Sequence, residues 1–157
     1  MEGQIPLKYG SDAVEIKGAR VLLNELEHSH VPWAIVTSGT RPLVNGWLKI
    51  LGFAQPQHLV TAEDVFEGKP NPECYLLGRQ RLYLKMETAP LVIEDAPAGV
   101  RAGKAADMRV LALATTHRPE ELIEAGADWI VKDLSYVSLK SIDNDGQVTM
   151  EIRGLYQ

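Results

Sequence analysis

Short apolar runs alternate with stretches of helical periodicity along most of the chain. Because strands and helices alternate over the length of one domain, this pattern predicts a parallel α/β sheet with helices on both of its faces. Runs without polar alternation, such as Leu91-Val92-Ile93, are typical of strands buried on both sides. The predicted strands are residues 33–37, 59–61, 91–94, 109–114 and 129–131, and the predicted helices lie near residues 19–27, 42–51, 72–82, 97–106 and 119–124.

Proline falls in the first turn of four predicted helices, at Pro42, Pro72, Pro97 and Pro119. It suits that position because its missing N–H would have no helical partner there and its φ is already helical. Asn71 is the expected N-cap of the helix that begins at Pro72. The prolines therefore support the helix assignments.

Both ends of the chain depart from the alternating pattern. In the polar residues 1–18, only residues 14–16 have the pattern of a short extended piece. We therefore interpret residues 1–18 as the end of a preceding segment. From Asp143 onward the sequence predicts a hairpin. The turn signal is Asn-Asp-Gly at residues 144–146, and the alternating residues 148–152 follow it.

Length and composition indicate one globular domain of 157 residues, with 45% hydrophobic and 24% charged residues. The net charge of −5 and the lack of a basic run argue against nucleic acid as a partner. The apolar runs are too short to span a membrane, and no signal sequence opens the chain. Cys74 is the only cysteine, so we expect no disulfide, no cysteine metal site and a reducing, cytoplasmic location. His58 and His117 lack the paired spacing of metal ligands.

A hydroxyl-rich segment follows the first of these strands. Thr37, Ser38 and Gly39 lie between that strand and the helix at Pro42. The free N–H groups and the dipole at a helix start favour an anion, and the Thr37 hydroxyl can add a hydrogen bond to a phosphate oxygen. Gly39 allows the backbone to approach a ligand closely. Alternatively, these residues only cap the helix.

Lys69 stands in a stiff loop, Gly-Lys-Pro-Asn-Pro at residues 68–72. The two prolines restrict the backbone, so the ammonium is presented with little conformational freedom. A lysine held in this way can neutralise charge that crowds between carboxylates and a phosphoryl group. The alternative is a lysine on a surface loop.

Glu94 and Asp95 come at the carboxyl end of a buried strand. Two adjacent carboxylates are costly there unless they bind a cation or find hydrogen-bond donors. Ligand sites of open α/β sheets lie beyond the carboxyl ends of the strands, and Mg²⁺ prefers hard oxygen ligands. The alternative is that Asp95 only caps the helix at Pro97.

The order of these three segments resembles motifs two, three and four of the haloacid dehalogenase superfamily of phosphatases. The chain is also similar to the fungal glycerol-phosphate and 2-deoxyglucose-6-phosphate phosphatases at residues 37–41, 68–73, 94–99 and 114–116. The resemblance covers about residues 5–135 and implies a Rossmann-like core.

The resemblance also implies roles for individual residues. Thr37 would bind the phosphoryl group, together with the backbone amides of residues 38 and 39. Lys69 would act in catalysis, stabilising the nucleophile and the transferred phosphoryl group. Glu94 and Asp95 would hold Mg²⁺, and Arg41 lies where related enzymes often place a side chain that contacts substrate.

The first motif of that superfamily, Asp-x-Asp-Gly-Thr, has no counterpart in the sequence. In the family its first aspartate attacks phosphorus and its second is the general acid and base. Here Asp-Gly occurs only at residues 145–146, without a preceding strand. The resemblance therefore predicts a core that lacks its first, central strand and most of a helical cap. Residues 1–18 would be the remnant of the cap linker and residues 19–157 the truncated core domain.

Two hypotheses about function follow. The first is a magnesium-dependent phosphomonoester hydrolase for a small sugar or polyol phosphate, inactive or needing completion without its nucleophile. The second is a non-catalytic protein that binds phosphate or magnesium, or that associates with itself. Loss of a central strand would leave two apolar strand edges open, so the expected partners are a small phosphorylated metabolite and either a second copy of the chain or a complementing strand. A dinucleotide-binding domain is disfavoured because no Gly-x-Gly-x-x-Gly follows a strand.

Overall fold

Two parallel sheets form the centre of the protein. The structure is a computed structural model, and it describes residues 2–85 and 87–156. In these residues β1 (Ile35–Val36) pairs with β2 (Leu59–Val60), and β3 (Leu91–Glu94), β4 (Arg109–Leu113) and β5 (Trp129–Val131) form the second sheet in that order. The α/β fold with parallel strands is thereby confirmed, with β1 and β2 shorter than the sequence predicts.

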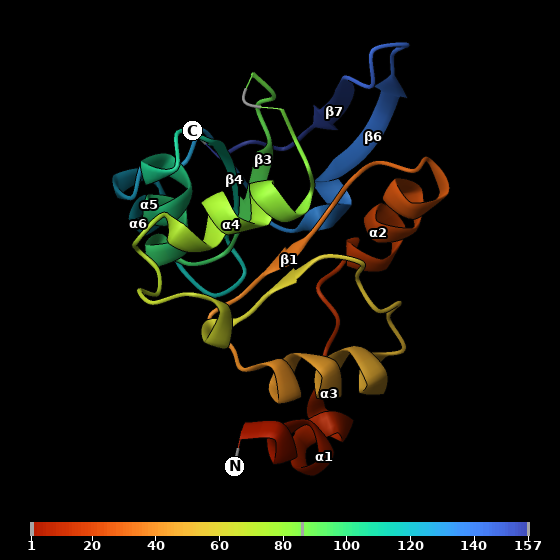
Figure 1. The fold of residues 1–157 in the computed structure, drawn as a ribbon, viewed down its shortest axis with the longest axis vertical. Coiled ribbons are helices and arrows are strands. Elements are labelled where there is room, and N and C mark those ends of the chain that lie inside the picture. The colour runs from red at the N-terminus through yellow and green to blue at the C-terminus, as the bar shows by residue number, and fades with distance from the viewer. Residues whose placement is uncertain (1, 86, 157) are drawn as a thin grey trace.

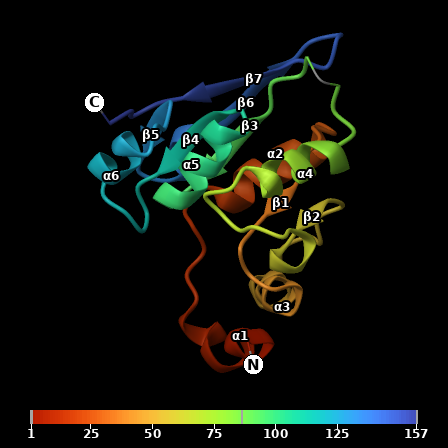
Figure 2. The ribbon, with the colours of Figure 1, turned by 60° about the vertical axis from the view of Figure 1, so that its left-hand side comes forward.

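The part of the chain that the structure describes contains six α-helices, of which α1 lies beyond α3 and away from the sheets (Figures 1 and 2). Those predicted from the sequence begin within one residue of the expected positions. The N-cap of α4 is Pro72 and not Asn71 as expected, although the Asn71 side chain accepts a hydrogen bond from the backbone N–H of Glu73. The helices of the described residues are α1 (Ile5–Tyr9), α2 (Ala19–His28), α3 (Arg41–Leu51), α4 (Glu73–Arg81), α5 (Pro97–Ala105) and α6 (Pro119–Glu124), with short 3-10 turns at Glu2–Gln4, Gly10–Asp12, Ala62–Asp64 and Leu134–Tyr136.

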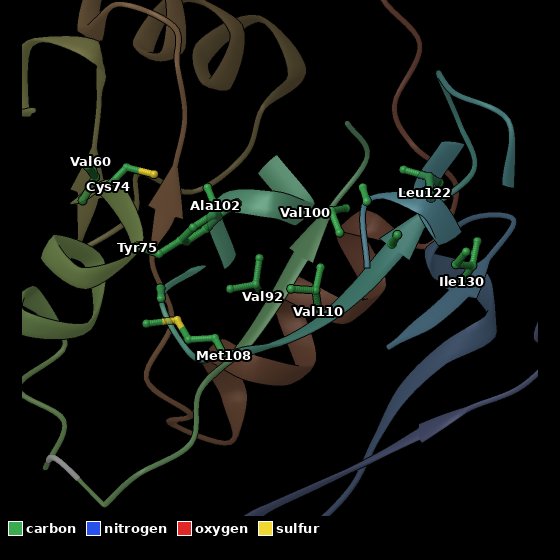
Figure 3. Close-up of a cluster of buried hydrophobic side chains, with 13 residues drawn as sticks. Val60, Cys74, Tyr75, Val92, Val100, Ala102, Met108, Val110, Leu122 and Ile130 are labelled. Carbon is green, nitrogen blue, oxygen red and sulfur yellow. The ribbon is translucent and has the colours of Figure 1, made fainter. Parts of the chain in front are cut away.

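The core lies on both faces of the β3–β5 sheet. Along β4, Val110 and Ala112 face one way and Leu111 and Leu113 the other, so each set joins its own buried cluster. The first cluster packs α4, α5 and α6 on the sheet (Figure 3). The second packs α2 and the C-terminal hairpin on the opposite face. Helices thus cover one face, while a helix and a hairpin share the other.

The N-terminal segment forms a helix that the sequence did not predict, and residues 14–16, expected as a short extended piece, form no strand in the structure described. Residues 2–12 form α1 between two 3-10 turns, and α1 lies beneath α3, at the end of the molecule away from the hairpin (Figure 1). Pro6 is buried against Gly46 of α3, where a β-carbon would crowd the proline ring. Helix α1 is too short to show helical periodicity in the sequence. Its position depends on this tertiary contact, so the sequence did not predict it.

The C-terminal hairpin is confirmed, but it begins earlier than Asp143. Strand β6 (Val137–Ile142) pairs antiparallel with β7 (Val148–Ile152). The turn closes with a hydrogen bond from the Gly146 N–H to the Asp143 carbonyl, and Gly146 adopts a φ of 79°. The sequence identified the turn and the second strand. It missed β6, whose outer half is exposed and carries little apolar alternation.

The two parallel sheets do not join. Among the described strands, β1 pairs only with β2, and β3 pairs only with β4. The other edge of β1 and the other edge of β3 therefore have no strand partner. Ile93, in the middle of β3, is 37% exposed although strand residues on either side are buried. The outer edge of β5 is different, because the Tyr156 N–H donates to the Ile130 carbonyl. Open edges on β1 and β3 are the arrangement expected from the sequence. No helix in residues 2–85 and 87–156 is long and apolar enough to cross a membrane.

Candidate active site

The hydroxyl-rich segment turns sharply between β1 and α3. The Thr37 hydroxyl accepts a 3.0 Å hydrogen bond from the Gly39 N–H, which leaves the hydroxyl hydrogen of Thr37 free to donate. Ser38 is exposed. The Arg41 N–H at the start of α3 donates to the Glu63 carboxylate at 3.0 Å. Thr37 and Ser38 can therefore still meet an anion, whereas the N–H groups of Gly39 and Arg41 already have acceptors.

Lys69 connects the ends of the two sheets. Its ammonium donates to the Val36 carbonyl at 3.2 Å and to Oε1 of Glu94, and it lies 5.0 Å from the centre of the Tyr75 ring. An ammonium has three hydrogens, so one remains for a further acceptor. Since Thr37 follows Val36 directly, that hydrogen and the Thr37 hydroxyl lie in the same region. The surface-loop alternative for Lys69 is wrong, because its side chain is only 12% exposed.

Glu94 is almost fully enclosed, with 8% of its surface exposed. Its Oε1 accepts from Lys69 and from the Tyr75 hydroxyl at 2.6 Å, and its Oε2 accepts from the backbone N–H groups of Asp95 and Ala96 at 3.0 and 3.2 Å. Gly99 makes room for this carboxylate, because a β-carbon there would overlap it. Both oxygens of Glu94 are thus held by donors from the protein.

The same contacts set the ionisation of this cluster. Burial by itself would raise the pKa of Glu94, but the charge of Lys69 and the hydrogen bonds from Lys69 and Tyr75 outweigh it and hold the pKa below its ordinary value. Burial, followed by the nearby Glu94 charge, raises the pKa of Tyr75 far above its ordinary value. Tyr75 therefore stays a neutral O–H donor beside an ionised carboxylate.

Asp95 projects from the carboxyl end of β3 and is half-buried. The Thr116 hydroxyl donates to its Oδ2 at 2.8 Å, and His117 Nδ1 lies 3.1 Å from its backbone oxygen. In the part of the chain that the structure describes, no other side chain donates to the Asp95 carboxylate. Asp95 therefore keeps lone pairs for a ligand.

The residues present fit one carboxylate ligand of a hard cation. Mg²⁺ binds through one or two protein carboxylates and keeps several waters, and Asp95 meets that need. The described residues contain no group of three or more His, Cys, Asp or Glu side chains that could hold a metal. Glu94 would have to give up a donor to join Asp95 in this role. A cation held at Asp95 would neutralise phosphoryl charge.

Arg41 does not join this cluster. Its Nη2 lies 2.8 Å from Oδ2 of Asp64 and 3.4 Å from the Thr61 hydroxyl. Together with Arg81 it lines a separate open hollow of about 450 Å³ beside β2. The structure therefore brings Thr37, Lys69 and the two carboxylates together and leaves Arg41 apart from them.

Three residues of the cluster were not singled out as site residues by sequence reasoning: Tyr75, Thr116 and His117. Thr116 and His117 follow β4, the neighbour of β3, so their position beyond the end of a parallel strand was a signal that could have found them. Tyr75 carried no comparable signal, since an aromatic residue in the first turn of a helix is more often part of the core.

The fold and this cluster define the class of the protein: a parallel α/β domain whose polar side chains gather beyond the carboxyl ends of its strands. The family described as haloacid dehalogenase-like hydrolase matches residues 8–113. The chain belongs to this family, which confirms the resemblance seen in the sequence.

Individual relatives agree with that assignment. The chain is 44% identical over 140 residues to glycerol-1-phosphate phosphohydrolase 2 of Saccharomyces cerevisiae, covering 85% of this chain and 56% of the relative. It is 38% identical over 124 residues to 2-deoxyglucose-6-phosphate phosphatase 2 of the same yeast, covering 74% and 50%. A solved hydrolase from Pseudomonas syringae superposes with a TM-score of 0.77 at 27% identity, covering 85% of this chain and 62% of that one. The chain thus spans about half the length of the curated relatives that it matches.

Proposed function

We propose that this chain carries most of the core of a magnesium-dependent phosphomonoester hydrolase that acts on a small sugar or polyol phosphate. The observation that carries the proposal is the Lys69 ammonium, which binds the end of β1 beside Thr37 and the end of β3 beside Asp95. A positive charge fixed between a free hydroxyl and a carboxylate suits a phosphoryl group with its cation. The named activities of the yeast relatives supply the substrate class.

Each residue has a role in this proposal. The Thr37 hydroxyl and Ser38 donate to phosphoryl oxygens, and the remaining hydrogen of Lys69 stabilises charge on the transferred group. Asp95 holds Mg²⁺, with Glu94 as its predicted companion. Contact between Arg41 and substrate would require the guanidinium to leave Asp64, since the two are 2.8 Å apart.

The attacking group must come from elsewhere. No Asp-x-Asp-Gly-Thr occurs in the 157 residues, Glu94 is engaged with Lys69, and this proposal assigns Asp95 to the cation. We therefore include in the proposal an aspartate nucleophile that these residues do not supply, carried on a strand that fits between β1 and β3. A reducing, cytoplasmic location belongs to the same proposal and is tested by fractionation of the source cells.

A hybrid protein tests the activity. The first motif and cap of the yeast glycerol-1-phosphate phosphohydrolase 2 are joined ahead of this chain, and phosphate release from glycerol 1-phosphate and 2-deoxyglucose 6-phosphate is measured with Mg²⁺. We expect the hybrid to hydrolyse at least one of them and the 157 residues alone to hydrolyse neither. Lys69→Met in the hybrid should lower kcat by about 10²–10³-fold, as for loss of one preorganised donor.

Two controls sharpen this test. A hybrid whose first motif aspartate is changed to asparagine should be inactive, which ties turnover to the added nucleophile. Lys140→Met, on the exposed hairpin, should leave the rate unchanged. A folded hybrid that releases phosphate no faster than buffer would refute the proposed activity.

The second candidate is a protein that binds phosphate or Mg²⁺ without turnover. It is favoured by the free hydrogens on Thr37 and Lys69 and the available lone pairs of Asp95, none of which needs a nucleophile in order to bind. Calorimetry with inorganic phosphate and with MgCl₂ distinguishes the outcomes. This candidate is supported if the 157 residues bind either ligand and the hybrid is inactive. It is refuted if the 157 residues bind neither phosphate nor Mg²⁺.

A further inference from the structure

The turn after β4 reaches across to the end of β3. Thr116 and His117 lie in this turn, and both contact Asp95, which is 21 residues earlier than Thr116 in the chain. The side chain of Thr116 contacts the Asp95 carboxylate, and the ring of His117 contacts the Asp95 backbone. Asp95 is therefore held from a second loop as well as from its own strand.

The direction of each hydrogen bond follows from the atoms involved. The Thr116 hydroxyl has one hydrogen and lies 2.8 Å from Oδ2 of Asp95 and 3.3 Å from the Asp95 backbone oxygen, so we assign that hydrogen to the nearer Oδ2. The Asp95 carbonyl can only accept, so Nδ1 of His117 carries the hydrogen for their 3.1 Å contact. The same Nδ1 lies 3.0 Å from the Thr116 oxygen, which is left as an acceptor. Asp95 is therefore held by two separate donors, the Thr116 hydroxyl at its Oδ2 and Nδ1 of His117 at its backbone carbonyl.

This arrangement fixes which carboxylate oxygen is available. The last torsion of an aspartate side chain is broad, so an unrestrained carboxylate samples many orientations. The hydrogen bond from the exposed Thr116 to Oδ2 restrains this torsion and leaves Oδ1 as the oxygen that faces a ligand. Groups that orient a metal-binding carboxylate in this way raise the affinity for the metal without touching it.

We infer that Thr116, supported by His117, is a positioning residue of the cation site: its hydroxyl orients the Asp95 carboxylate for Mg²⁺. The inference rests on the proposed role of Asp95 as a magnesium ligand. Thr115 provides a matched control, because in residues 2–85 and 87–156 its hydroxyl makes no hydrogen bond and it stands in the same turn.

Magnesium affinity is the direct test. The ¹⁵N-labelled chain is titrated with MgCl₂, and the backbone amide signals of Asp95 and Ala96 report binding. Thr116→Val removes the hydroxyl at nearly constant shape and should raise the dissociation constant for Mg²⁺ by about 10–100-fold. Thr116→Ser, which keeps the hydroxyl, should bind like wild type, and so should Thr115→Val. Amide shifts of β4 and β5 report whether each variant keeps its fold.

The outcomes separate the inference from the proposed function. If wild type binds Mg²⁺ and Thr116→Val binds it equally well, the positioning role is refuted while the cation site stands. If wild type shows no response to Mg²⁺, the cation site fails, and the positioning role fails with it. A long-range ¹H–¹⁵N spectrum gives a readout independent of metal: neutral His117 should carry its hydrogen on Nδ1, and a hydrogen on Nε2 would refute the hydrogen bond from His117 to the Asp95 carbonyl and with it the support that His117 gives.

Discussion

At the scale of single residues, the Lys69–Glu94 pair is the ion pair that the site encloses. Both side chains are nearly enclosed, at 12% and 7% exposed, and Glu94 accepts from three further donors. A pair of this kind contributes little net stability compared with apolar residues of similar size, but removing one partner leaves an uncompensated charge in the interior.

Glu94→Gln should therefore destabilise the protein by about 3–5 kcal/mol, because the Lys69 charge would lose its buried counter-ion. Urea unfolding measures this change. The double variant Lys69→Met with Glu94→Gln should recover part of the loss. Glu151→Gln, which breaks an exposed pair with Lys140 on the hairpin, should cost less than about 1 kcal/mol. Equal losses for the two glutamates would show that Glu94 and Lys69 are not paired in solution.

At the scale of elements, Asp64 joins the structure around β2. Its carboxylate accepts from Arg81 of α4 and Arg41 of α3 at 2.8 Å each, and from the N–H and hydroxyl of Thr61 at 2.8 and 2.9 Å. The hydrogen bond from Arg81, with those from Thr61, holds the pKa of Asp64 far below its ordinary value against the opposing effect of burial. One carboxylate thus ties two helices to the end of a two-residue strand.

This linkage gives a defined pH dependence. A carboxylate whose pKa is lower in the folded than in the unfolded state stabilises the fold above its ordinary pKa of about 4, and that stabilisation disappears as the pH falls. Asp64→Asn should cost about 2–3 kcal/mol at pH 7, from the loss of charge-assisted hydrogen bonds. The difference from wild type should shrink as the pH is lowered from 5 towards about 2 in urea unfolding series. Asp145→Asn, in the exposed hairpin turn, is the surface control, and a difference for Asp64→Asn that does not change with pH would contradict the linkage.

At the scale of the whole molecule, the two parallel sheets present strand edges without partners. β1 and β3 are apolar and end at the site, and Ile93 of β3 is exposed. Unpaired apolar edges promote association between chains, and a charged side chain on such an edge opposes it. Self-association through these edges is therefore expected for the isolated 157 residues.

Ile93→Lys should weaken this association by placing a charge beside the open edge of β3. Light scattering over a concentration series measures the average mass, which should rise with concentration for wild type and remain near one chain for the variant. Ile123→Lys is the matched control, because Ile123 is a comparably exposed isoleucine on α6, away from the open edges. If both variants associate as wild type does, the chains do not associate through the open strand edges.

Local pattern was sufficient to predict much of the fold. The helix starts at Pro97 and Pro119 and the strand at Leu91–Glu94 are specified by proline geometry and by continuous apolar runs, which act over a few neighbouring residues. Helix α1 was missed because its stability comes from contacts with the distant helix α3. Strand β6 was missed because its outer half is exposed and carries little apolar alternation. The order of Thr37, Lys69 and Asp95 along the chain was likewise sufficient to identify the protein family.

The contacts among those residues were decided by tertiary structure. Glu94 and Asp95 are adjacent and chemically alike in sequence, yet folding encloses Glu94 among four donors and leaves Asp95 with free lone pairs. The reason is geometric: alternate residues of a strand face opposite sides, so Glu94 points to α4 and α5 while Asp95 already lies in the loop. Sequence by itself determined which residue types stand at the strand ends. Only the packing of α4 and of the turn after β4 decided which carboxylate holds a lysine and which keeps lone pairs without donors.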